Sequence, residues 1–338
     1  MKTRRVYFEA KEHVAIRIEE VEPLPDEILV KGYMSSICGT DKNHFLGFLP
    51  RTTRVDAFNL GGYSDPSPYP RFVGHEGAGT IIAVGSAVTG YKEGDQVMSF
   101  TGKNATMADY WAAKIQPRGT SVQKVLEGMT MEEASLGEPA ACAIYAGMQS
   151  GVELGDTVLI VGAGFAGQVM AQVVRQMGAG KVIVSDIVNA KLELAKKLSA
   201  DITVDASNED TVDVVLRETN GKGADVVIEA AGNEDSIQVC TDAVKHGGII
   251  GFYSWVLHPV NLIIDRWHND GFDIRTLAVM HRIKHDKEWY QVKALSNIVN
   301  GKINIKPLIT DIYKLDDVVA AFDCACNNPE SCKVMLRP

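Results

Sequence analysis

Hydrophobic positions divide the chain into stretches with different patterns. From residue 1 to about residue 146, short runs of β-type residues are separated by Gly, Pro and Asp turns, which is typical of a mostly β domain. From about residue 150 to 279, apolar strands alternate with amphipathic helical segments, which predicts a parallel α/β sheet that is buried on both faces. The expected strands are 15–20, 27–34, 77–85 and 95–100 in the first stretch and 157–163, 181–186, 226–232 and 248–253 in the second, with helices at 167–178, 190–200 and 235–245.

The end of the chain predicts two more amphipathic helices and a short terminal strand. The helices lie within 285–301 and 311–327, the second beginning near Leu315, and the strand covers 332–338. Because these elements cannot form a core alone, we expect them to fold back on the first domain. The expected domains are therefore residues 1–148, completed by 280–338, and residues 149–279.

Composition and charge narrow the class of partner. The chain has 338 residues, of which 46% are hydrophobic and 23% charged, as in ordinary two-domain globular proteins. Its net charge of −9 disfavours broad electrostatic binding to nucleic acid or to an anionic membrane. The N-terminus lacks the apolar stretch of a secretory signal, and the six cysteines are too scattered for a disulfide framework. We expect a cytoplasmic protein with a small-molecule partner.

A glycine motif predicts a phosphate-binding turn. Residues 162–167 fit G-x-G-x-x-G, directly after an apolar strand and directly before a helix. In such a motif the first glycine permits the tight turn, the second lets the backbone approach a pyrophosphate, and the third allows close packing of helix on strand. The helix N-terminus adds free N–H groups. The expected cofactor contacts are Gly162, Gly164, Phe165, Ala166 and Gly167.

An acidic residue at the end of the next strand favours NAD as the dinucleotide. Asp186 stands nineteen residues beyond Gly167, where a carboxylate would accept hydrogen bonds from the ribose hydroxyls. The same carboxylate would repel the 2′-phosphate of NADP, although Lys191 could approach the ribose. Gly232 is a further candidate for cofactor contact. The alternative is a glycine-rich turn in an unrelated α/β protein.

Four residues of the first domain form a candidate zinc-binding set. Cys38, His75, Glu76 and Glu138 offer thiolate, imidazole and carboxylate groups, which suit zinc. Glu138 lies among Ala and Leu residues, where a carboxylate would be poorly solvated without a cation. Singly, each residue is more simply a buried thiol, a core histidine or a surface carboxylate. Together, ahead of a dinucleotide-binding pattern, they favour a metal site.

The motifs resemble those of the zinc-dependent medium-chain dehydrogenase/reductase family, and within it the sorbitol and threonine dehydrogenase-like branch. The resemblance spans nearly the whole chain, and the matching segments are 38–41, 74–79, 94–97, 138–139 and 162–167. It implies an α/β fold with a GroES-like β domain and a Rossmann domain, whose doubly wound parallel sheet binds NAD. It also implies one catalytic zinc between the domains, held by Cys38, His75 and either Glu76 or Glu138, and a homodimer or homotetramer joined through sheet edges.

The chain departs from that family in three places. No cysteine stands between Cys38 and Cys142, so we expect no second, structural zinc. The segment 43–70 lengthens the separation of Cys38 and His75 to 37 positions, and it is either a pocket or oligomer element or a packed surface loop. The position of the relay histidine in many relatives is Asn43 here, with His44 following it.

The resemblance implies NAD-dependent oxidation of a secondary alcohol, or reduction of the matching ketone, with a polyol, sugar or cyclitol as the favoured substrate class. Zinc would act as a Lewis acid on the alcohol. Thr40 would take the alcohol proton, His44 or water would carry it on, and Asp41 would orient His75. Two alternatives stay open: a zinc-free, quinone-reductase-like NAD(P)H reductase, and a dinucleotide-binding protein without catalysis.

Overall fold

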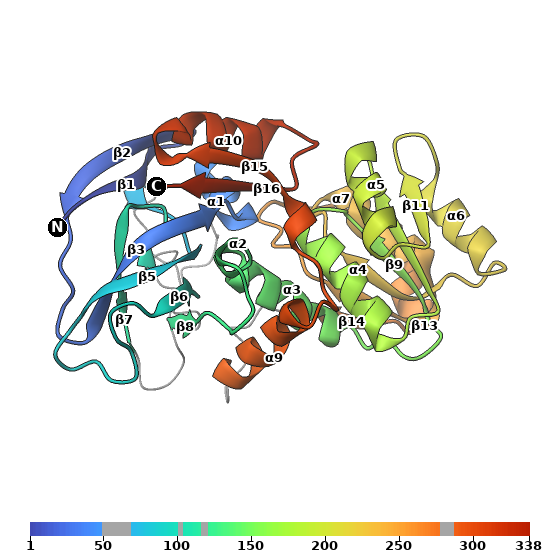
Figure 1. Ribbon diagram of the computed structural model, residues 1–338. Helices are drawn as coiled ribbons and strands as arrows, with labels where there is room; N and C mark the ends of the chain where they lie inside the picture. The colour runs from blue at the N-terminus through green and yellow to red at the C-terminus, as the bar shows by residue number, and fades with distance from the viewer. Residues whose placement is uncertain (49–68, 101–103, 116–120, 278–286) are drawn as a thin grey trace. The chain divides into compact units, whose positions relative to one another are not determined.

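The chain divides into two compact units. The computed structural model describes residues 1–48, 69–100, 104–115, 121–277 and 287–338. The first unit comprises Met1–Pro139, His285–Val299 and Leu308–Pro338, and the second comprises Ala140–Lys284 and Asn300–Pro307 (Figure 1). The division at residue 139 falls inside helix α3, Gly137–Met148, nine residues before the expected boundary at 148.

The segment 300–307 also differs from the expected domain limits, because it packs with the second unit. The side chain of Gln172 donates to the carbonyl of Asn304 at 3.0 Å and accepts from its N–H at 2.7 Å. This paired hydrogen bond ties the segment to helix α4, Phe165–Met177, of the second unit.

Two sheets form the β part of the first unit. Strands β2, β1 and β4 form one in that order, and β15, β16, β3, β5, β6 and β8 form the other, in which β7 also pairs with β3. The strands are β1 Lys2–Ala10, β2 His13–Glu20, β3 Glu27–Ser36, β4 Arg71–Phe72, β5 Glu76–Val84, β6 Gln96–Ser99, β7 Tyr110–Lys114, β8 Val122–Lys124, β15 Ile309–Lys314 and β16 Lys333–Arg337. The helices are α1 Gly39–Phe45, α2 Met131–Ser135, α9 Lys287–Val299 and α10 Val318–Asn327, with 3-10 turns at Lys306–Leu308 and Leu315–Asp317.

A cluster of buried apolar side chains stabilises the larger sheet. Ile28, Val30, Ile81, Val97 and Trp111 come from four of its strands and form one core cluster with no more than 1% of any side chain exposed. The strands expected at 27–34, 77–85 and 95–100 are confirmed as β3, β5 and β6. The hydrophobic pattern did not indicate the first strand, β1, because its basic residues hide the alternation of buried Val6 and Phe8 with half-buried neighbours.

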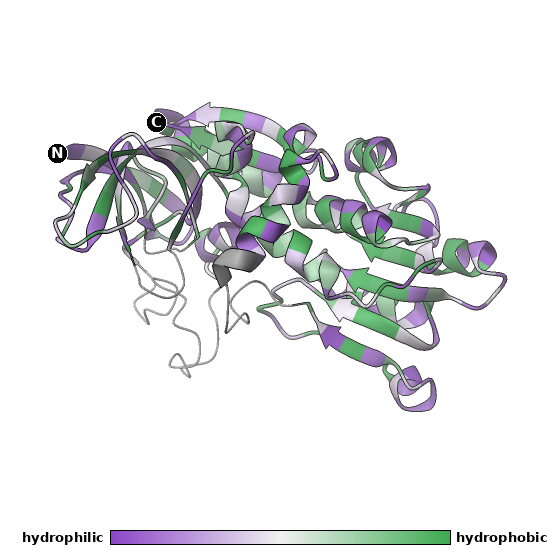
Figure 2. Cartoon of the chain, turned by 60° about the horizontal axis from the view of Figure 1, so that its bottom comes forward, coloured by the Kyte–Doolittle hydropathy of each residue, from purple (hydrophilic) through white to green (hydrophobic). Residues whose placement is uncertain are grey.

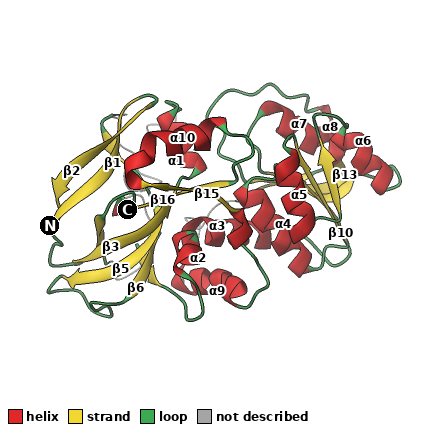
Figure 3. Cartoon of the chain, turned by 45° about the horizontal axis from the view of Figure 1, so that its top comes forward, coloured by secondary structure: helices red, strands yellow, loops and turns green. Residues whose placement is uncertain are grey.

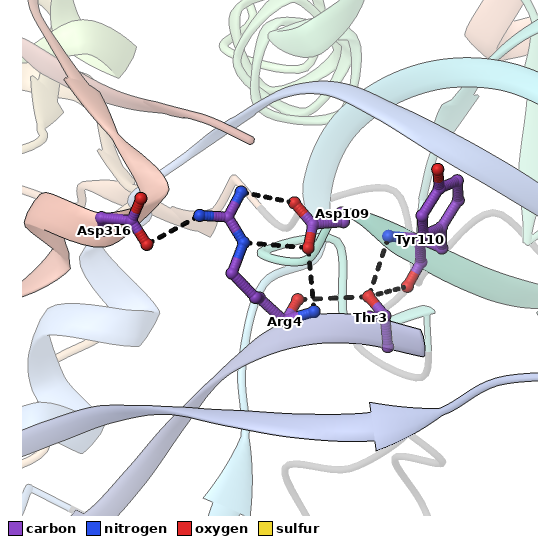
Figure 4. A network of polar contacts seen from close by, with 5 residues as sticks. All are labelled: Thr3, Arg4, Asp109, Tyr110 and Asp316. Carbon is purple, nitrogen blue, oxygen red and sulfur yellow. Dashed lines mark hydrogen bonds and ion pairs between the residues drawn. The ribbon is translucent and has the colours of Figure 1, made fainter. Parts of the chain in front are cut away.

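The two ends of the chain meet in the first unit. Arg4 in β1 forms ion pairs with Asp109 at 2.7 Å and with Asp316 at 2.6 Å, and Thr3 exchanges hydrogen bonds with Tyr110 (Figure 4). The two carboxylates raise the pKa of Arg4 above its usual value. Because Asp316 belongs to the C-terminal segment, these ion pairs join that segment to the start of the chain within the first unit.

One expected helix is shorter than its sequence pattern suggested. Residues 311–314, which we assigned to the amphipathic stretch 311–327, belong to strand β15 instead. Their exposure alternates along the strand, and β15 pairs in parallel with β16, so neighbouring backbone decides their conformation. Helix α10 begins only at Val318, after the 3-10 turn that starts at Leu315.

The second unit is a six-stranded parallel sheet with helices on both faces (Figure 3). Its strand order is β11, β10, β9, β12, β13, β14. Figure 2 shows hydrophobic residues along most of these strands and both hydrophobic and hydrophilic residues on the helices. The strands are β9 Thr157–Val161, β10 Lys181–Asp186, β11 Ile202–Asp205, β12 Ala224–Glu229, β13 Val244–Phe252 and β14 Asp273–Thr276, and the helices besides α4 are α5 Asn189–Leu198, α6 Thr211–Glu218, α7 Glu234–Ala243 and α8 Asp265–Asn269.

The candidate cofactor residues lie at the carboxyl ends of neighbouring strands of this sheet. The chain adds strands on one side of β9 and then, from β12, on the other side, and ligands of doubly wound sheets bind outside the carboxyl ends of the strands at such a switch point. The glycine motif follows β9, Asp186 ends β10, and Glu229 ends β12. The expected fold, a β domain with a doubly wound parallel-sheet domain, is confirmed. Within the described ranges, no helix has the length and apolarity needed to cross a bilayer.

Candidate metal centre and dinucleotide site

Three of the four predicted metal ligands come together in the first unit. Cys38 follows β3 as the N-cap of helix α1, and His75 and Glu76 stand at the start of β5. The antiparallel pairing of β3 with β5 sets Ser36 opposite Glu76, which brings the two sequence motifs to the same end of the sheet. One donor atom from each of Cys38, His75 and Glu76 lies within 4.8 Å of the others.

The two oxygens of Glu76 have different surroundings. Oε2 lies 2.6 Å from the Lys333 ammonium and also accepts a hydrogen bond from the Ser36 hydroxyl. Oε1 is buried and has no hydrogen-bond partner among the described residues. It lies 4.0 Å from Nε2 of His75, which is too long for a hydrogen bond. The carboxylate therefore presents one unsatisfied oxygen to the cysteine and the histidine.

Burial and mutual charge shift the pKa values of the three groups. Burial raises the pKa of the Cys38 thiol, and the Glu76 charge raises it further. Burial lowers the pKa of His75, but the charges of Cys38 and Asp41 outweigh this and hold it well above its usual value. Burial also raises the pKa of Glu76, but the charges of Lys333 and His75 and the hydrogen bonds from Lys333 and Ser36 together outweigh it, and the net shift is downward. A cation among these groups would stabilise both anions.

The residues fit zinc. Thiolate, imidazole and carboxylate bind zinc at about 2.0–2.3 Å, so ligand atoms around a tetrahedral ion are separated by roughly 3.3–3.8 Å. The three donor atoms lie within 4.8 Å of one another, and the 4.0 Å between His75 and Glu76 suits two ligands of one ion better than a direct contact. The unsatisfied Oε1 of Glu76 would gain its missing partner.

Glu138, the fourth predicted ligand, does not join this group of three. It lies half-buried in the first turn of α3. Its charge reaches the cluster, because it contributes to raising the pKa of both His75 and Lys333. Of the two carboxylates that the sequence left as alternatives, Glu76 is the one whose oxygen lies with the sulfur and the imidazole.

Helix α1 carries the two residues expected to pass the proton, Thr40 and His44, and the residue expected to orient His75, Asp41. The Thr40 hydroxyl is half-buried and lies 3.7 Å from the Cys38 sulfur. Asp41 is fully buried, accepts a hydrogen bond from the Cys38 N–H at 3.0 Å, and has its other oxygen 3.7 Å from Nδ1 of His75. That last distance exceeds a hydrogen bond, so the two groups interact here through charge.

His44 is fully buried on the same helix. Burial lowers its pKa to about 3, and the charges of Arg71 and His75 act in the same direction. The imidazole is therefore neutral at physiological pH, which makes it a poor resting proton carrier. The segment 43–70, whose role the sequence left open, falls largely outside the described residues, which resume at Tyr69.

The glycine motif forms a tight turn between β9 and α4 of the second unit. Gly162 has φ +107°, and a Cβ there would lie 2.8 Å from the N–H nitrogen of Ala231. A Cβ on Gly167 would lie 1.9 Å from the Gly162 carbonyl oxygen, so only glycine allows this packing. A Cβ on Gly164 would meet nothing within 4 Å. The open side of the turn is therefore at Gly164, the N-cap of α4, next to Phe165 and Ala166.

Asp186 holds the glycine turn as well as standing at the expected ribose position. Its Oδ2 accepts from the Ala163 N–H at 2.7 Å, and its Oδ1 accepts from the Val188 N–H at 2.9 Å. A carboxylate oxygen has a second lone pair for a ribose hydroxyl. Lys191 lies in the first turn of α5, and its carbonyl accepts a hydrogen bond from the Gln168 side chain at 2.8 Å.

Two site residues were missed in the sequence. Lys333 approaches Glu76 from the terminal strand, and Ser36 approaches from β3. The only sequence signal for Lys333 was a lysine directly before three apolar residues, Val334 to Leu336, which are buried in the same strand. A lysine in such a strand needs a buried counter-ion, but the pattern does not say which acid supplies it.

Comparisons with known proteins match this chain to dehydrogenases. One family model, described as the alcohol dehydrogenase GroES-like domain, matches residues 24–133, and another, described as zinc-binding dehydrogenase, matches residues 166–300. The sorbitol dehydrogenase of Gallus gallus is 28% identical over 94% of this chain and 90% of that protein. The L-threonine 3-dehydrogenase of Rhizobium etli is 27% identical over 98% of each.

Solved structures show the same fold. An oxidoreductase/dehydrogenase of unknown specificity from Escherichia coli has a TM-score of 0.83 with 26% identity, over 100% of this chain and 99% of that one. The 2R,3R-butanediol dehydrogenase of Bacillus subtilis also has a TM-score of 0.83, with 21% identity over 99% of each chain.

Proposed function

Because the chain belongs to the zinc-dependent medium-chain dehydrogenase/reductase family, we propose that it transfers a hydride between NAD and a secondary alcohol or the matching ketone. The observation that carries this proposal is the convergence of Cys38, His75 and Glu76, with an unsatisfied carboxylate oxygen among them. The favoured substrates are polyols, sugars or cyclitols, since two relatives that match 94% and 96% of this chain are named sorbitol dehydrogenase. The zinc-free reductase alternative is disfavoured by the intact ligand set.

The proposed cofactors are one zinc ion and NAD. Cys38, His75 and Glu76 would hold the zinc, with Glu138 as a second carboxylate whose charge reaches the site. A single zinc is proposed because no cysteine stands between Cys38 and Cys142. We propose NAD rather than NADP because Asp186 ends β10, and an acidic residue at the end of this strand in doubly wound folds accepts hydrogen bonds from the ribose hydroxyls and would repel a 2′-phosphate.

Residues around the metal ligands supply the proton chemistry. Zinc, when bound, supplies a Lewis acid that favours loss of the alcohol proton. We assign the Thr40 hydroxyl, which lies 3.7 Å from the Cys38 sulfur, the role of accepting that proton while passing on its own. Its onward acceptor is water rather than His44, because the pKa of His44 is about 3. Asp41 orients Cys38 through its backbone N–H and faces His75 with its charge.

The proposed assembly is a homodimer or homotetramer that contains a contact between the edges of the second unit's sheets. Strand β14 is the last strand of that sheet among the described residues, and Ile274 on it is 40% exposed. Pairing two such edges would cover the exposed backbone groups. Light scattering of the purified protein tests this, and a monomer at all concentrations would contradict it.

Zinc content is the experiment that tests the function first. Protein purified without added metal or chelator is expected to contain about one zinc per chain by elemental analysis. It is then assayed with NAD against a panel of polyols, cyclitols and their ketones. Folded protein that contains no zinc and cannot regain it would overturn the proposal. Zinc and NAD binding without turnover across the panel would favour a non-catalytic binding protein.

A further inference from the structure

A buried glutamate holds the turn that follows strand β12. Glu229 is the last residue of β12 and is fully buried. Its Oε1 accepts three hydrogen bonds, from the N–H groups of Ala231 and Gly232 at 2.9 and 2.6 Å and from the Ser236 hydroxyl at 2.7 Å. All three donors belong to the turn 230–232 or to the start of helix α7. One carboxylate oxygen therefore fixes the conformation of the whole turn.

This turn packs directly against the glycine motif. The Ala230 N–H donates to the carbonyl of Val161 at 2.8 Å, and the nitrogen of Ala231 lies 2.8 Å from where a Cβ on Gly162 would be. Gly232 has φ +84°, which a residue with a side chain rarely adopts. The shape of the space beside Gly162 thus depends on where the turn 230–232 lies.

The order of the strands indicates which part of a dinucleotide would meet this turn. Strand β9, with the glycine motif, lies between β10 and β12. Asp186 at the end of β10 stands at the adenosine ribose position, and Gly164 is open for a pyrophosphate. A dinucleotide that continues in the same direction along the strand ends passes over the end of β12. The turn 230–232 therefore lies under the nicotinamide half.

We propose that Glu229 is a positioning residue, which fixes the turn 230–232 so that the turn can seat the nicotinamide half of NAD. This inference rests on the proposed function. Glu229 acts through the turn and needs no contact with the cofactor. Only Oε1 takes part, because Oε2 is buried and has no hydrogen-bond partner among the described residues. A glutamine, which retains one acceptor oxygen, can hold the turn in the same way.

The test measures binding of NADH and of ADP to the full-length, zinc-loaded protein. For Glu229→Ala, two N–H groups and a hydroxyl lose their acceptor, and we expect the dissociation constant of NADH to rise about tenfold. Binding of ADP, which lacks the nicotinamide half, is expected to stay within about twofold of wild type. Glu229→Gln is expected to bind NADH nearly as wild type does. Asp235→Ala, an exposed acid in the first turn of the same helix, is the matched control.

The outcomes separate a positioning role from general damage. Unchanged NADH binding by Glu229→Ala would overturn the inference, and so would equal weakening of NADH and ADP. If Glu229→Ala does not fold, Ser236→Ala decides, because it removes one of the three donors and leaves the carboxylate. Weaker NADH binding with unchanged ADP binding by Ser236→Ala supports the inference, and no change overturns it. Wild-type protein that binds neither nucleotide would instead refute the proposed NAD site itself.

Discussion

The ammonium of Lys333 lies 2.6 Å from a carboxylate oxygen of Glu76, and both side chains are buried. Strand β16 pairs with β3 so that Met335 is opposite Ser36, and the Ile37 N–H donates to the Val334 carbonyl. Continuing this antiparallel register by one more residue sets Lys333 opposite Cys38. The last strand of the chain thus delivers a cation to the candidate metal centre.

Replacing Lys333 by methionine is expected to destabilise the first unit. Removing one partner of a buried ion pair leaves an uncompensated charge, which costs about 3–5 kcal/mol. Urea unfolding of the metal-free protein should show a loss of that order for Lys333→Met, and the double variant Lys333→Met/Glu76→Gln should recover much of it. Lys314→Met, an exposed lysine in β15, is the control. Equal stability of Lys333→Met and wild type would mean that the pair contributes nothing.

Replacing Cys38 by serine is expected to remove zinc. A serine hydroxyl is a much weaker zinc ligand than a thiolate, and only His75 and Glu76 of the close group would remain. Elemental analysis should find close to zero zinc per chain, and NAD-linked turnover should be lost with it. Cys326→Ser, a half-buried cysteine on α10, should keep both. A Cys38→Ser protein with full zinc and activity would refute the ligand assignment.

Acid is expected to destabilise the protein partly through His44. Its pKa is about 3 in the folded chain, because of burial and then the charges of Arg71 and His75, against an ordinary value of 6.5. Between these two values the unfolded chain binds a proton that the folded chain does not, so stability falls as pH falls from about 6.5 towards 3. At pH 5 the contribution lost is up to about 2 kcal/mol.

The variant His44→Gln isolates that contribution. The free energy of unfolding should drop less between pH 7 and pH 5 in His44→Gln than in wild type. His13→Gln removes an exposed histidine and should follow the wild-type curve. If His44→Gln shows the same acid loss as wild type, the histidine is not buried in its neutral form in solution.

Removing the charge of Asp186 is expected to weaken the preference for NAD. Asp186→Asn retains one acceptor oxygen but no longer repels a 2′-phosphate, so the ratio of kcat/KM for NAD to that for NADP should fall about tenfold or more. Asp205→Asn, a carboxylate at the end of the neighbouring strand β11, is the matched control. An unchanged ratio would indicate that Asp186 serves only to hold the Ala163 N–H and Val188 N–H groups.

The sequence predicted those parts of the site that are local in the chain. The spacing of glycines after an apolar strand is enough to indicate the turn at Gly162, because its geometry depends on a few neighbouring residues. Cys38 and His75 stand in short motifs at strand ends, where ligands commonly lie. The parallel sheet follows from the alternation of strands and helices, whereas its doubly wound order, with β12 beside β9, was implied by the family resemblance.

The parts that sequence reasoning missed depend on contacts between distant segments. Lys333 and Glu76 are joined only because β16 pairs with β3, and no local pattern contains that register. Glu229 reads as an ordinary strand end until its three hydrogen bonds to the following turn are seen. Residues 311–314 likewise form a strand because they pair with β16, although their own sequence pattern indicated a helix.

The first unit is built from segments that precede and follow most of the second unit in the chain. This arrangement affects the order in which the two units can fold during synthesis. Residues 140–307, which hold the second unit, are complete before β16 has been synthesised. Domains fold as units while the chain emerges from the ribosome. The parallel sheet can therefore form before Lys333 has been synthesised and can pair with Glu76 beside Cys38 and His75. The candidate metal centre can therefore be completed only after the residues of the second unit have been synthesised, because Lys333 follows them in the chain.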